Sequence, residues 1–309
     1  MGEEPKPSRR GGSLGYAIFR VAARLTGLRG AYGLLYFVCI HYLLFDREAV
    51  GLASAYVKRR FPKAGRIKRA LIMYRLFISL GKQLIDRTAC MSGSVEFDVN
   101  HVGLDEFLSL IDGADGGLIL LVSHVGNWQV AMTRLVDVKR DVYVLMRPEE
   151  NPGVIESLHI NEGYGNVKIL AVTPDHSTVI QIMDLLSKGN IVAIMGDRRY
   201  GADGCNVKFL GDEARFPYGA FSIAAGVRCP LVLLLSFKEG AYSYAADFTH
   251  VFHPRYEKGR EKKEQIREWV QAYARALEEK LEKYPLQWFM FRDLWKDAAI
   301  SRDAERPST

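Results

Sequence analysis

The chain of 309 residues is long enough for one large α/β domain or two small ones. Its hydrophobic content of 48% and charged content of 25% are ordinary for a globular protein, and its net charge is a modest +6. Basic residues gather before residue 30 and over residues 58–69, which suits an anionic membrane surface or, for the second group, a solvated helix face. Without zinc-finger spacing, an RNA-binding aromatic signature or a cluster of metal-ligating residues, we expect no nucleic-acid partner, no metal and no bound cofactor.

The N-terminal part of the chain predicts helices that contact a membrane. Residues 1–14 are polar and are expected to be a disordered tail, and residues 15–90 a helical region. Within this region, residues 31–45 form an apolar run of about fifteen residues, short of the roughly twenty needed to span a bilayer. An interfacial or membrane-dipping helix is therefore favoured over a span, and the alternative is an ordinary buried helix. Two further helices are expected over residues 49–87, joined near Pro62.

Residues 91–296 alternate strand patterns with amphipathic helix patterns. Such alternation predicts an α/β fold in which a mostly parallel sheet is covered by helices on both faces. We expect this region to form a single domain with the preceding helices, followed by a tail at 297–309. The expected strands are 94–99 at an edge, 118–123, 141–146, 166–171, 191–195, 231–236 and 242–248. The expected helices are 103–113, 128–136, 153–163, 177–187, 219–226 and 259–283, with a loop at 147–152.

One histidine stands where α/β proteins place their chemical groups. The apolar strand 118–123 stops at His124, a short Val-Gly-Asn turn follows, and a helix pattern begins at Trp128. The end of a buried strand is rigid and faces the ligand crevice of the sheet, so His124 is a candidate general base. On periodicity alone the plainer alternative, a satisfied polar residue, remains open.

Five blocks in order resemble the glycerolipid and lipid A acyltransferase superfamily. The first, His124 to Gln129, resembles the His-x4-Asp/Glu signature, which the lipid A branch writes His-x-Gly-Asn-Trp-Glu. Residues 191–198 are similar to the strand and loop that line the family's acceptor site, and residues 209–219 to the segment that follows it. Residues 229–234 are similar to the family's proline-initiated strand, and residues 285–292 to its closing Pro-x-Gln-Trp block. The resemblance covers residues 15–296, and the Gly-Asp-Arg form looks closest to predicted acyltransferases found beside aryl-polyene genes.

The resemblance implies catalytic roles for the matched residues. His124 would be the general base on the acceptor hydroxyl, and Gln129 stands where the family has the carboxylate that orients the histidine. An amide can hold the imidazole but cannot supply the negative charge. Asp197, at the end of another expected strand, is a candidate for the missing carboxylate, and a structural salt bridge is the alternative.

Four further residues are expected to bind substrate. Arg198 would hold an anionic group of the acceptor. Asn127 would cap the following helix or donate to the thioester oxygen, with capping favoured. Trp288 and Arg292 would line the acyl groove or the floor of the headgroup site, although aromatic residues at such spacing are more often core.

The expected function is that of a membrane-associated acyltransferase at the cytoplasmic face of the bacterial inner membrane, peripheral or N-terminally anchored. It would move a fatty acyl group from an acyl-carrier protein or coenzyme A thioester to a hydroxyl of a lipid or glycolipid. No Gly-x-Ser-x-Gly elbow is present, so direct transfer is favoured over a serine acyl-enzyme. Gln129 leaves open a natural variant with a second carboxylate, an engineered trap or a lipid-binding pseudoenzyme, and an acyl thioesterase is a further alternative.

Overall fold

The computed structural model describes residues 13–113, 116–132, 138–146, 166–172, 177–199 and 203–305. Within these ranges the first helices are α1 (Ser13–Phe45), α2 (Arg47–Arg60) and α3 (Arg66–Met91). The strands are β1 (Asp98–Val102), β2 (Leu118–Val122), β3 (Val142–Met146), β4 (Val167–Ala171), β5 (Ile191–Met195), β6 (Cys205–Phe209), β7 (Asp212–Phe216), β8 (Leu231–Lys238) and β9 (Ser243–Phe252). The other helices are α4 (Leu104–Gly113), α5 (Trp128–Met132), α7 (Ser177–Ser187), α8 (Gly219–Val227), α9 (Lys262–Lys283) and α10 (Leu294–Glu305).

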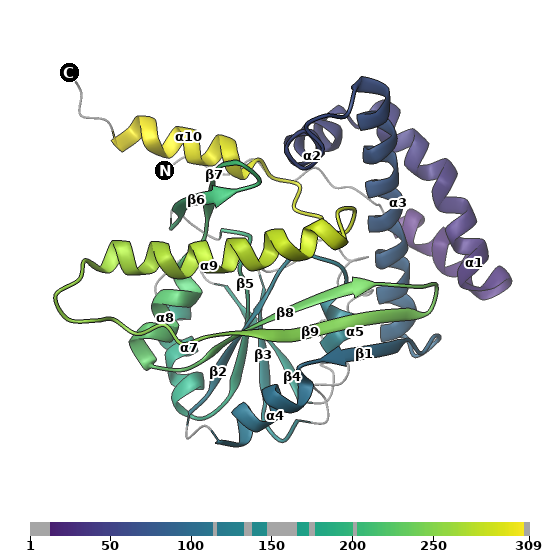
Figure 1. Ribbon diagram of the computed structural model, residues 1–309. Helices are drawn as coiled ribbons and strands as arrows, with labels where there is room; N and C mark the ends of the chain where they lie inside the picture. The colour runs from purple at the N-terminus through teal and green to yellow at the C-terminus, as the bar shows by residue number, and fades with distance from the viewer. Residues whose placement is uncertain are drawn as a thin grey trace.

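Most of the strands form one sheet, in the order β1-β9-β8-β2-β5-β3-β4. Neighbours in this sheet are parallel except β8 and β9, which are antiparallel. Strands β6 and β7 pair separately as an antiparallel hairpin. In Figure 1, α9 crosses the upper part of the sheet, with the hairpin and α10 above it and with α3 and α1 beside it. The predicted α/β class with a mostly parallel sheet is confirmed.

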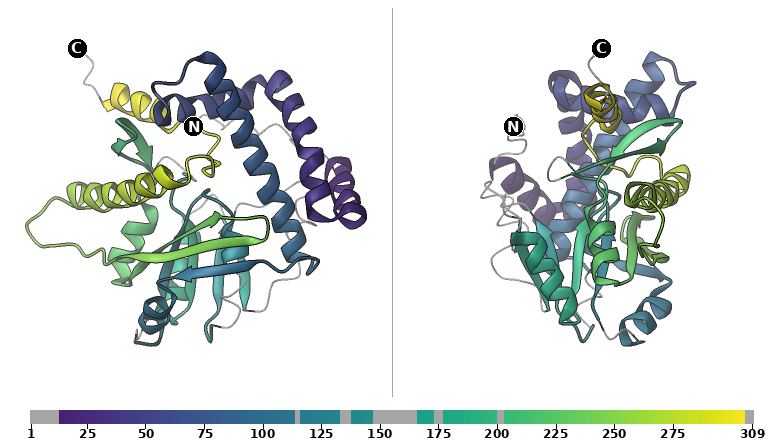
Figure 2. Two further views of the ribbon diagram at one scale, coloured as in Figure 1. Left: turned by 45° about the vertical axis from the view of Figure 1, so that its right-hand side comes forward. Right: turned by 90° about the vertical axis from the view of Figure 1, so that its left-hand side faces the viewer.

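The central strands are apolar throughout because helices cover both faces of the sheet. Every residue of β2 is buried. Its side chains alternate between two hydrophobic clusters: Ile119 and Leu121 belong to the cluster that includes α3, α8 and α9, whereas Leu118 and Leu120 belong to the cluster that includes α4. Continuous apolar strands are what a parallel sheet between two helical layers requires. The two views in Figure 2 show helices on either side of the sheet.

Helix α1 is fixed to the rest of the protein by a buried polar cluster around Asp86 of α3. The Asp86 carboxylate accepts hydrogen bonds from the Tyr32 hydroxyl of α1 and the Tyr244 hydroxyl of β9. Lys238 of β8 donates to the same carboxylate at 2.6 Å. Asp86 is fully buried, and burial raises its pKa, whereas the Lys238 ammonium opposes that shift. Because a buried carboxylate is costly without such partners, the cluster specifies where α1 packs on α3.

Helix α1 is apolar on the face that it turns outward. By length and composition alone, its segment Val21–Phe45 could cross a membrane. A kink divides this segment at Gly27, where φ is +68°, a conformation that favours glycine. Beyond the kink, the exposed large apolar side chains are Tyr36, Phe37, Ile40, Leu44 and Phe45. The structure therefore contains the predicted N-terminal apolar helix.

The structure departs from the predicted elements at three places. The edge strand begins at Asp98 and not at Ser94, because its partner β9 begins at Ser243, which pairs with Asp98. The sequence patterns miss the hairpin β6–β7, whose short strands are joined at Leu210 and Gly211. Residues 297–305, expected in the tail, continue helix α10, which is anchored by its buried apolar residues. Most of the tail predicted at 1–14, the loop at 147–152, the helix at 153–163 and the end of the helix at 128–136 lie outside the described residues.

Replacing Lys238 by methionine should destabilise the fold by about 3–5 kcal/mol, because it leaves the buried Asp86 carboxylate without its cation. Lys168→Met is the matched control, since its pair with Asp141 is exposed and screened by solvent, and such pairs contribute little to stability. Urea unfolding measures both losses. Adding Asp86→Asn to Lys238→Met should recover part of the lost stability. Equal small losses in Lys238→Met and Lys168→Met would contradict this role of the cluster.

Candidate active site

The turn that carries His124 connects β2 to α5 and depends on glycine at position 126. Gly126 has a φ of +60°, and a Cβ atom there would lie 1.5 Å from the carbonyl oxygen of Ser236. Any side chain at this position would therefore collide with β8 and would also strain the backbone. The glycine of the His-x-Gly block thus allows the turn to lie directly against the sheet.

The same turn is bound to the segment 287–289. The Gly126 N–H donates to the Gln287 carbonyl, and the Phe289 N–H donates to the His124 carbonyl, both at 2.7 Å. Between these two bonds the segments pair as an isolated antiparallel β-bridge. Two of the blocks singled out in the sequence are thereby in direct contact, although they lie far apart along the chain.

Strand register brings His124 and Asp197 to the same level at the edge of the sheet. Strands β2 and β5 are parallel neighbours, and their last paired residues are Val122 and Met195. His124 and Asp197 each follow two residues later, so both leave the sheet at the same edge. Asp197, which the sequence offers as a candidate for the missing carboxylate, therefore lies beside the candidate base.

The imidazole of His124 is held by the carboxylate of Asp197. His124 Nδ1 lies 2.8 Å from Asp197 Oδ1, and the His124 backbone N–H donates to Oδ2, also at 2.8 Å. The indole Nε1–H of Trp288 donates to the same Oδ2 at 2.9 Å. Asp197 is completely buried, whereas the His124 side chain is 24% exposed. The buried carboxylate therefore holds the imidazole at Nδ1, and Nε2 lies on the side of the ring that faces away from Asp197.

The charge of Asp197 decides which nitrogen of His124 carries the proton. Burial raises the pKa of the Asp197 carboxyl, but the positive charge of His124 and hydrogen bonds from His124 and Trp288 outweigh burial, so the pKa lies below its ordinary value. The carboxylate is ionised at neutral pH and accepts the Nδ1 proton. Nε2 is then the basic nitrogen of the neutral ring, and no residue in the described ranges donates to it. Such a histidine can take a proton from a hydroxyl group.

Gln129 and Asn127 lie at the start of α5. Gln129 is half-buried, and its side chain makes no hydrogen bond to His124. Asn127 is buried, and its Oδ1 accepts the Val130 N–H at 3.4 Å, the geometry of a helix cap. Its Nδ2 donates to the Gln83 carbonyl at 3.0 Å. Asn127 therefore performs the capping role that the sequence favours, and it ties the turn to α3.

Trp288, expected to line an acyl groove, lies in the core. It is 1% exposed, and its ring packs edge-on against Tyr56 of α2 and Phe209 of β6, with centroids 5.0 and 5.3 Å away. Because the indole N–H of Trp288 donates to Asp197, Trp288 orients the carboxylate and does not face a substrate. No periodicity in the sequence signals this contact, since the two partners belong to different blocks.

The two arginines that follow Asp197 have different surroundings. Arg198, expected to bind the acceptor, is exposed and pairs with no residue in the described part of the chain. Arg199 is turned inward: its side chain is 12% exposed, and its Nη2 donates to Asp297 Oδ2 at 3.0 Å. Arg292 donates to the same oxygen at 2.9 Å. No sequence pattern selects Arg199 over Arg198, because the chain bends at residues 196–198 and the alternation of the strand ends there.

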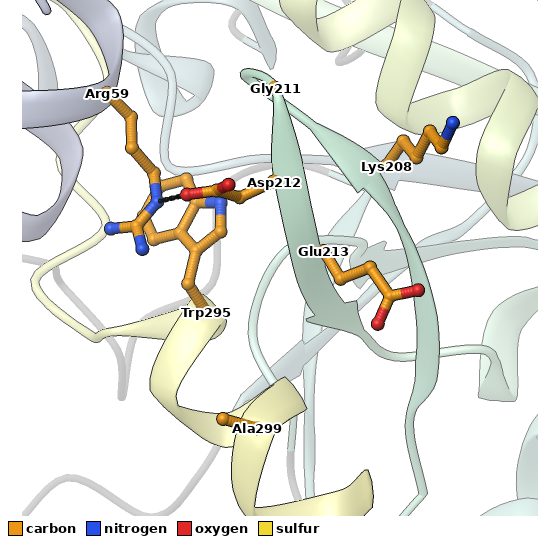
Figure 3. Close-up of a pocket in the computed structure, with 7 residues that line it drawn as sticks. All are labelled: Arg59, Lys208, Gly211, Asp212, Glu213, Trp295 and Ala299. Atoms are coloured by element: carbon orange, nitrogen blue, oxygen red, sulfur yellow. Dashed lines mark hydrogen bonds and ion pairs between the residues drawn. The ribbon is translucent and has the colours of Figure 1, made fainter.

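A hollow of about 370 Å³ between α2, the hairpin and α10 contains none of the predicted site residues (Figure 3). Arg59 reaches across it to Asp212 at 2.8 Å and lies over the ring of Trp295. Lys208 and Glu213 line the hairpin side. Within the described ranges, no group of three or more His, Cys, Asp or Glu side chains is placed to hold a metal ion. Among the described residues, the His124 turn carries the histidine–carboxylate pair that could act in catalysis.

Comparison with known proteins finds a family that matches most of the chain. The family model described as bacterial lipid A biosynthesis acyltransferase matches residues 44–297. The matched range contains the His124 turn, Asp197 and the segment 287–292, and it leaves out nearly all of α1. A comparison with curated proteins finds no match.

The contribution of Asp197 to stability should depend on pH. Its pKa is lower in the folded than in the unfolded chain, so its stabilisation is present above the ordinary carboxyl pKa of about 4 and is lost as the pH falls through the lower folded value. The free energy of unfolding lost in Asp197→Asn should therefore be largest above about pH 5 and should shrink below about pH 4. Urea unfolding at several pH values measures this loss. Gln129→Ala removes no carboxylate, so its effect on the free energy of unfolding should not follow this pH profile. A loss of stability in Asp197→Asn that grows in acid would refute the assignment of Asp197 as an ionised carboxylate.

Proposed function

Because the chain belongs to the bacterial lipid A biosynthesis acyltransferase family, we propose that it transfers a fatty acyl group from a thioester to a hydroxyl of a lipid or glycolipid. The donor would be an acyl-carrier protein or coenzyme A thioester, whose thiol leaves without strong acid assistance. In this proposal His124 is the general base, and Asp197 is the carboxylate that orients it and balances its charge.

The contact between His124 Nδ1 and the buried Asp197 is the observation that carries this proposal. The family resemblance calls for a carboxylate at position 129, where this chain has glutamine. A carboxylate 2.8 Å from Nδ1 can supply the negative charge that the Gln129 amide lacks. The amide at position 129 is therefore a weak argument for an inactive lipid-binding protein.

The proposed reaction is a direct transfer. The acceptor hydroxyl gives its proton to His124 Nε2 while its oxygen attacks the carbonyl carbon of the thioester. Asp197 stabilises the imidazolium that forms. The tetrahedral intermediate then collapses, the C–S bond breaks, and the leaving thiolate takes the proton from Nε2. The products are an acylated lipid and a free thiol, and the base is restored.

Asp197→Asn should reduce turnover far more than Gln129→Ala. A comparable acid-to-amide change in a serine-protease triad costs about 10⁴-fold, so we expect a loss of roughly 10²- to 10⁴-fold for Asp197→Asn. Gln129→Ala should cost less than about tenfold, because its side chain makes no hydrogen bond to the imidazole. Acylated lipid formed from a labelled acyl donor and a lipid extract is measured by mass spectrometry.

Two outcomes of that assay would change the proposal. If Asp197→Asn retained activity while Gln129→Glu raised it strongly, the working carboxylate would belong at position 129. Release of free fatty acid without acylated lipid would identify a thioesterase that uses water as the acceptor.

We further propose that α1 lies in the surface of the bacterial inner membrane, on the cytoplasmic side where the acyl donors occur. The helix beyond the Gly27 kink, residues 28–45, is shorter than the roughly 20 residues that a span needs, and the Tyr32–Asp86 bond holds it against α3. Exposed cations without an ion pair to a described residue lie at the corner between α2 and α3, where they suit anionic headgroups. These cations are Lys58, Lys63, Arg66 and Lys68.

The double substitution Phe37→Glu and Leu44→Glu should weaken binding to anionic lipid vesicles by about tenfold or more, because each side chain would otherwise bury apolar surface in the membrane. Vesicle flotation measures the bound fraction. Ile180→Glu is the control, since Ile180 is 68% exposed but lies on α7. Equal binding by all variants would show that α1 does not contact the lipid.

A further inference from the structure

We propose that Gln287 is a positioning residue for the transfer reaction. This inference rests on the acyltransferase function proposed above. Gln287 lies in the closing Pro-x-Gln-Trp block, directly before the tryptophan that donates to Asp197. Its side-chain amide fixes the segment 287–289 against β8 and α3, and that segment holds both His124 and Asp197.

The Gln287 amide takes the place of a neighbouring strand at the end of β8. Its Oε1 accepts the Lys238 N–H and its Nε2 donates to the Lys238 carbonyl, both at 2.8 Å. Strand β2 pairs with β8 only as far as Val122 and Leu234, so Lys238 lies beyond the reach of β2. The amide therefore provides the donor and the acceptor that β2 provides to earlier residues of β8.

The segment fixed by this amide supports both members of the proposed histidine–carboxylate pair. The backbone of segment 287–289 is joined to the His124 turn by two hydrogen bonds of 2.7 Å. The Trp288 indole of the same segment donates to Asp197 at 2.9 Å. A shift of Gln287 therefore moves the support of the imidazole and that of the carboxylate together. Because a displacement of about 1 Å can cost about 10²-fold in rate, the anchoring of this segment bears on turnover.

Gln83 of α3 orients the same amide at a cost in stability. Its Nε2 donates to Gln287 Oε1 at 3.0 Å, the single hydrogen bond of its side chain within the described ranges. Its own Oε1 is buried and has no hydrogen-bond partner among those residues. A buried acceptor without a donor is unfavourable, and an apolar side chain of similar size would avoid this penalty. A positioning role for Gln287 accounts for the polar group that is kept at position 83.

Gln265 makes the same pair of bonds away from the site and offers a matched control. Its Oε1 accepts the Glu257 N–H at 2.8 Å, and its Nε2 donates to the Glu257 carbonyl at 3.3 Å. Gln265 is buried near the start of α9, and its side-chain hydrogen bonds go to residues 257–260. A substitution at Gln265 thus removes an equivalent set of hydrogen bonds, none of them to the segment 287–289.

Gln287→Met should lower kcat about 10- to 100-fold and change KM less than about threefold, because it displaces the base without removing a group proposed to bind substrate. Gln265→Met should change kcat less than about threefold. Turnover of the full chain in detergent is measured by mass spectrometry, with acyl-coenzyme A as donor and a lipid extract as acceptor. Equal losses of kcat in the two variants, or a rise in KM alone, would overturn the proposal.

Gln83→Met separates positioning from stability, even if Gln287→Met fails to fold. It removes the buried acceptor that has no partner, so the melting temperature should stay the same or rise. It also removes a hydrogen bond that orients Gln287, so kcat should fall about three- to tenfold. A purely structural role would make kcat follow the melting temperature. An unchanged kcat in Gln83→Met would therefore count against a positioning role and overturn the proposal.

The indole N–H resonance of Trp288 reports the position of the segment without any turnover. The chain has four tryptophans, and Trp288→Phe identifies the resonance of interest in a ¹H–¹⁵N spectrum. Gln287→Met should shift this resonance and speed its exchange with solvent by about tenfold or more, because the segment is no longer held to β8. Gln265→Met should leave the resonance where it is. A Trp288 signal that is the same with and without the Gln287 amide would refute the proposal.

The spectrum keeps this inference separate from the proposed function. If Gln287→Met shifts the Trp288 resonance but the unmodified chain transfers no acyl group, the positioning by Gln287 stands and the acyltransferase proposal falls. If the unmodified chain transfers acyl groups and Gln287→Met alters neither kcat nor the resonance, the acyltransferase proposal stands and the role of Gln287 falls.

Discussion

Asp197 carries a negative charge in a place that solvent does not reach, and the groups around it are arranged to compensate that charge. The His124 ring, the His124 backbone N–H and the Trp288 indole all donate to its two oxygens. Because an ionised carboxylate is costly to bury without such donors, the ends of β2 and β5 and the segment 287–289 must come together for the fold to be stable. The hydrogen bonds that orient the proposed base thus also hold the segment 287–289 against the carboxyl ends of β2 and β5.

The chemistry of the site requires a negative charge at Nδ1 of the histidine, and it does not require that charge at a particular position in the sequence. One position for that charge is residue 129, in the first turn of the helix that follows the His124 turn. The parallel pairing of β2 with β5 provides another, since residues two beyond Val122 and Met195 leave the sheet at the same level. The combination of Gln129 with a buried Asp197 is therefore consistent with a working base, and the proposed mechanism depends on this geometry.

Helix α3 connects the apolar helix α1 to the proposed site. Its Asp86 holds Tyr32 of α1, and one turn earlier its Gln83 accepts a hydrogen bond from Asn127 through the backbone carbonyl. The side chain of Gln83 also donates to Gln287, next to Trp288. These contacts join α1 to the His124 turn through a single helix. If α1 lies in the membrane surface, as proposed, the packing of α3 would fix the position of the turn relative to that surface.

The sequence by itself determined the fold class, most strand positions and the place of the candidate base. These features are local: a strand covered on both faces needs a continuous apolar run, and a tight turn against β8 needs glycine at position 126. The edge strand and the hairpin β6–β7 were less visible, because their extent depends on a partner strand and not on their own pattern. Tertiary structure alone decided that Asp197 contacts His124, that Trp288 supports Asp197, and that Arg199 and not Arg198 turns inward. Each of these outcomes joins segments far apart along the chain, and periodicity within one segment carries no information about the direction of a side chain after the backbone bends.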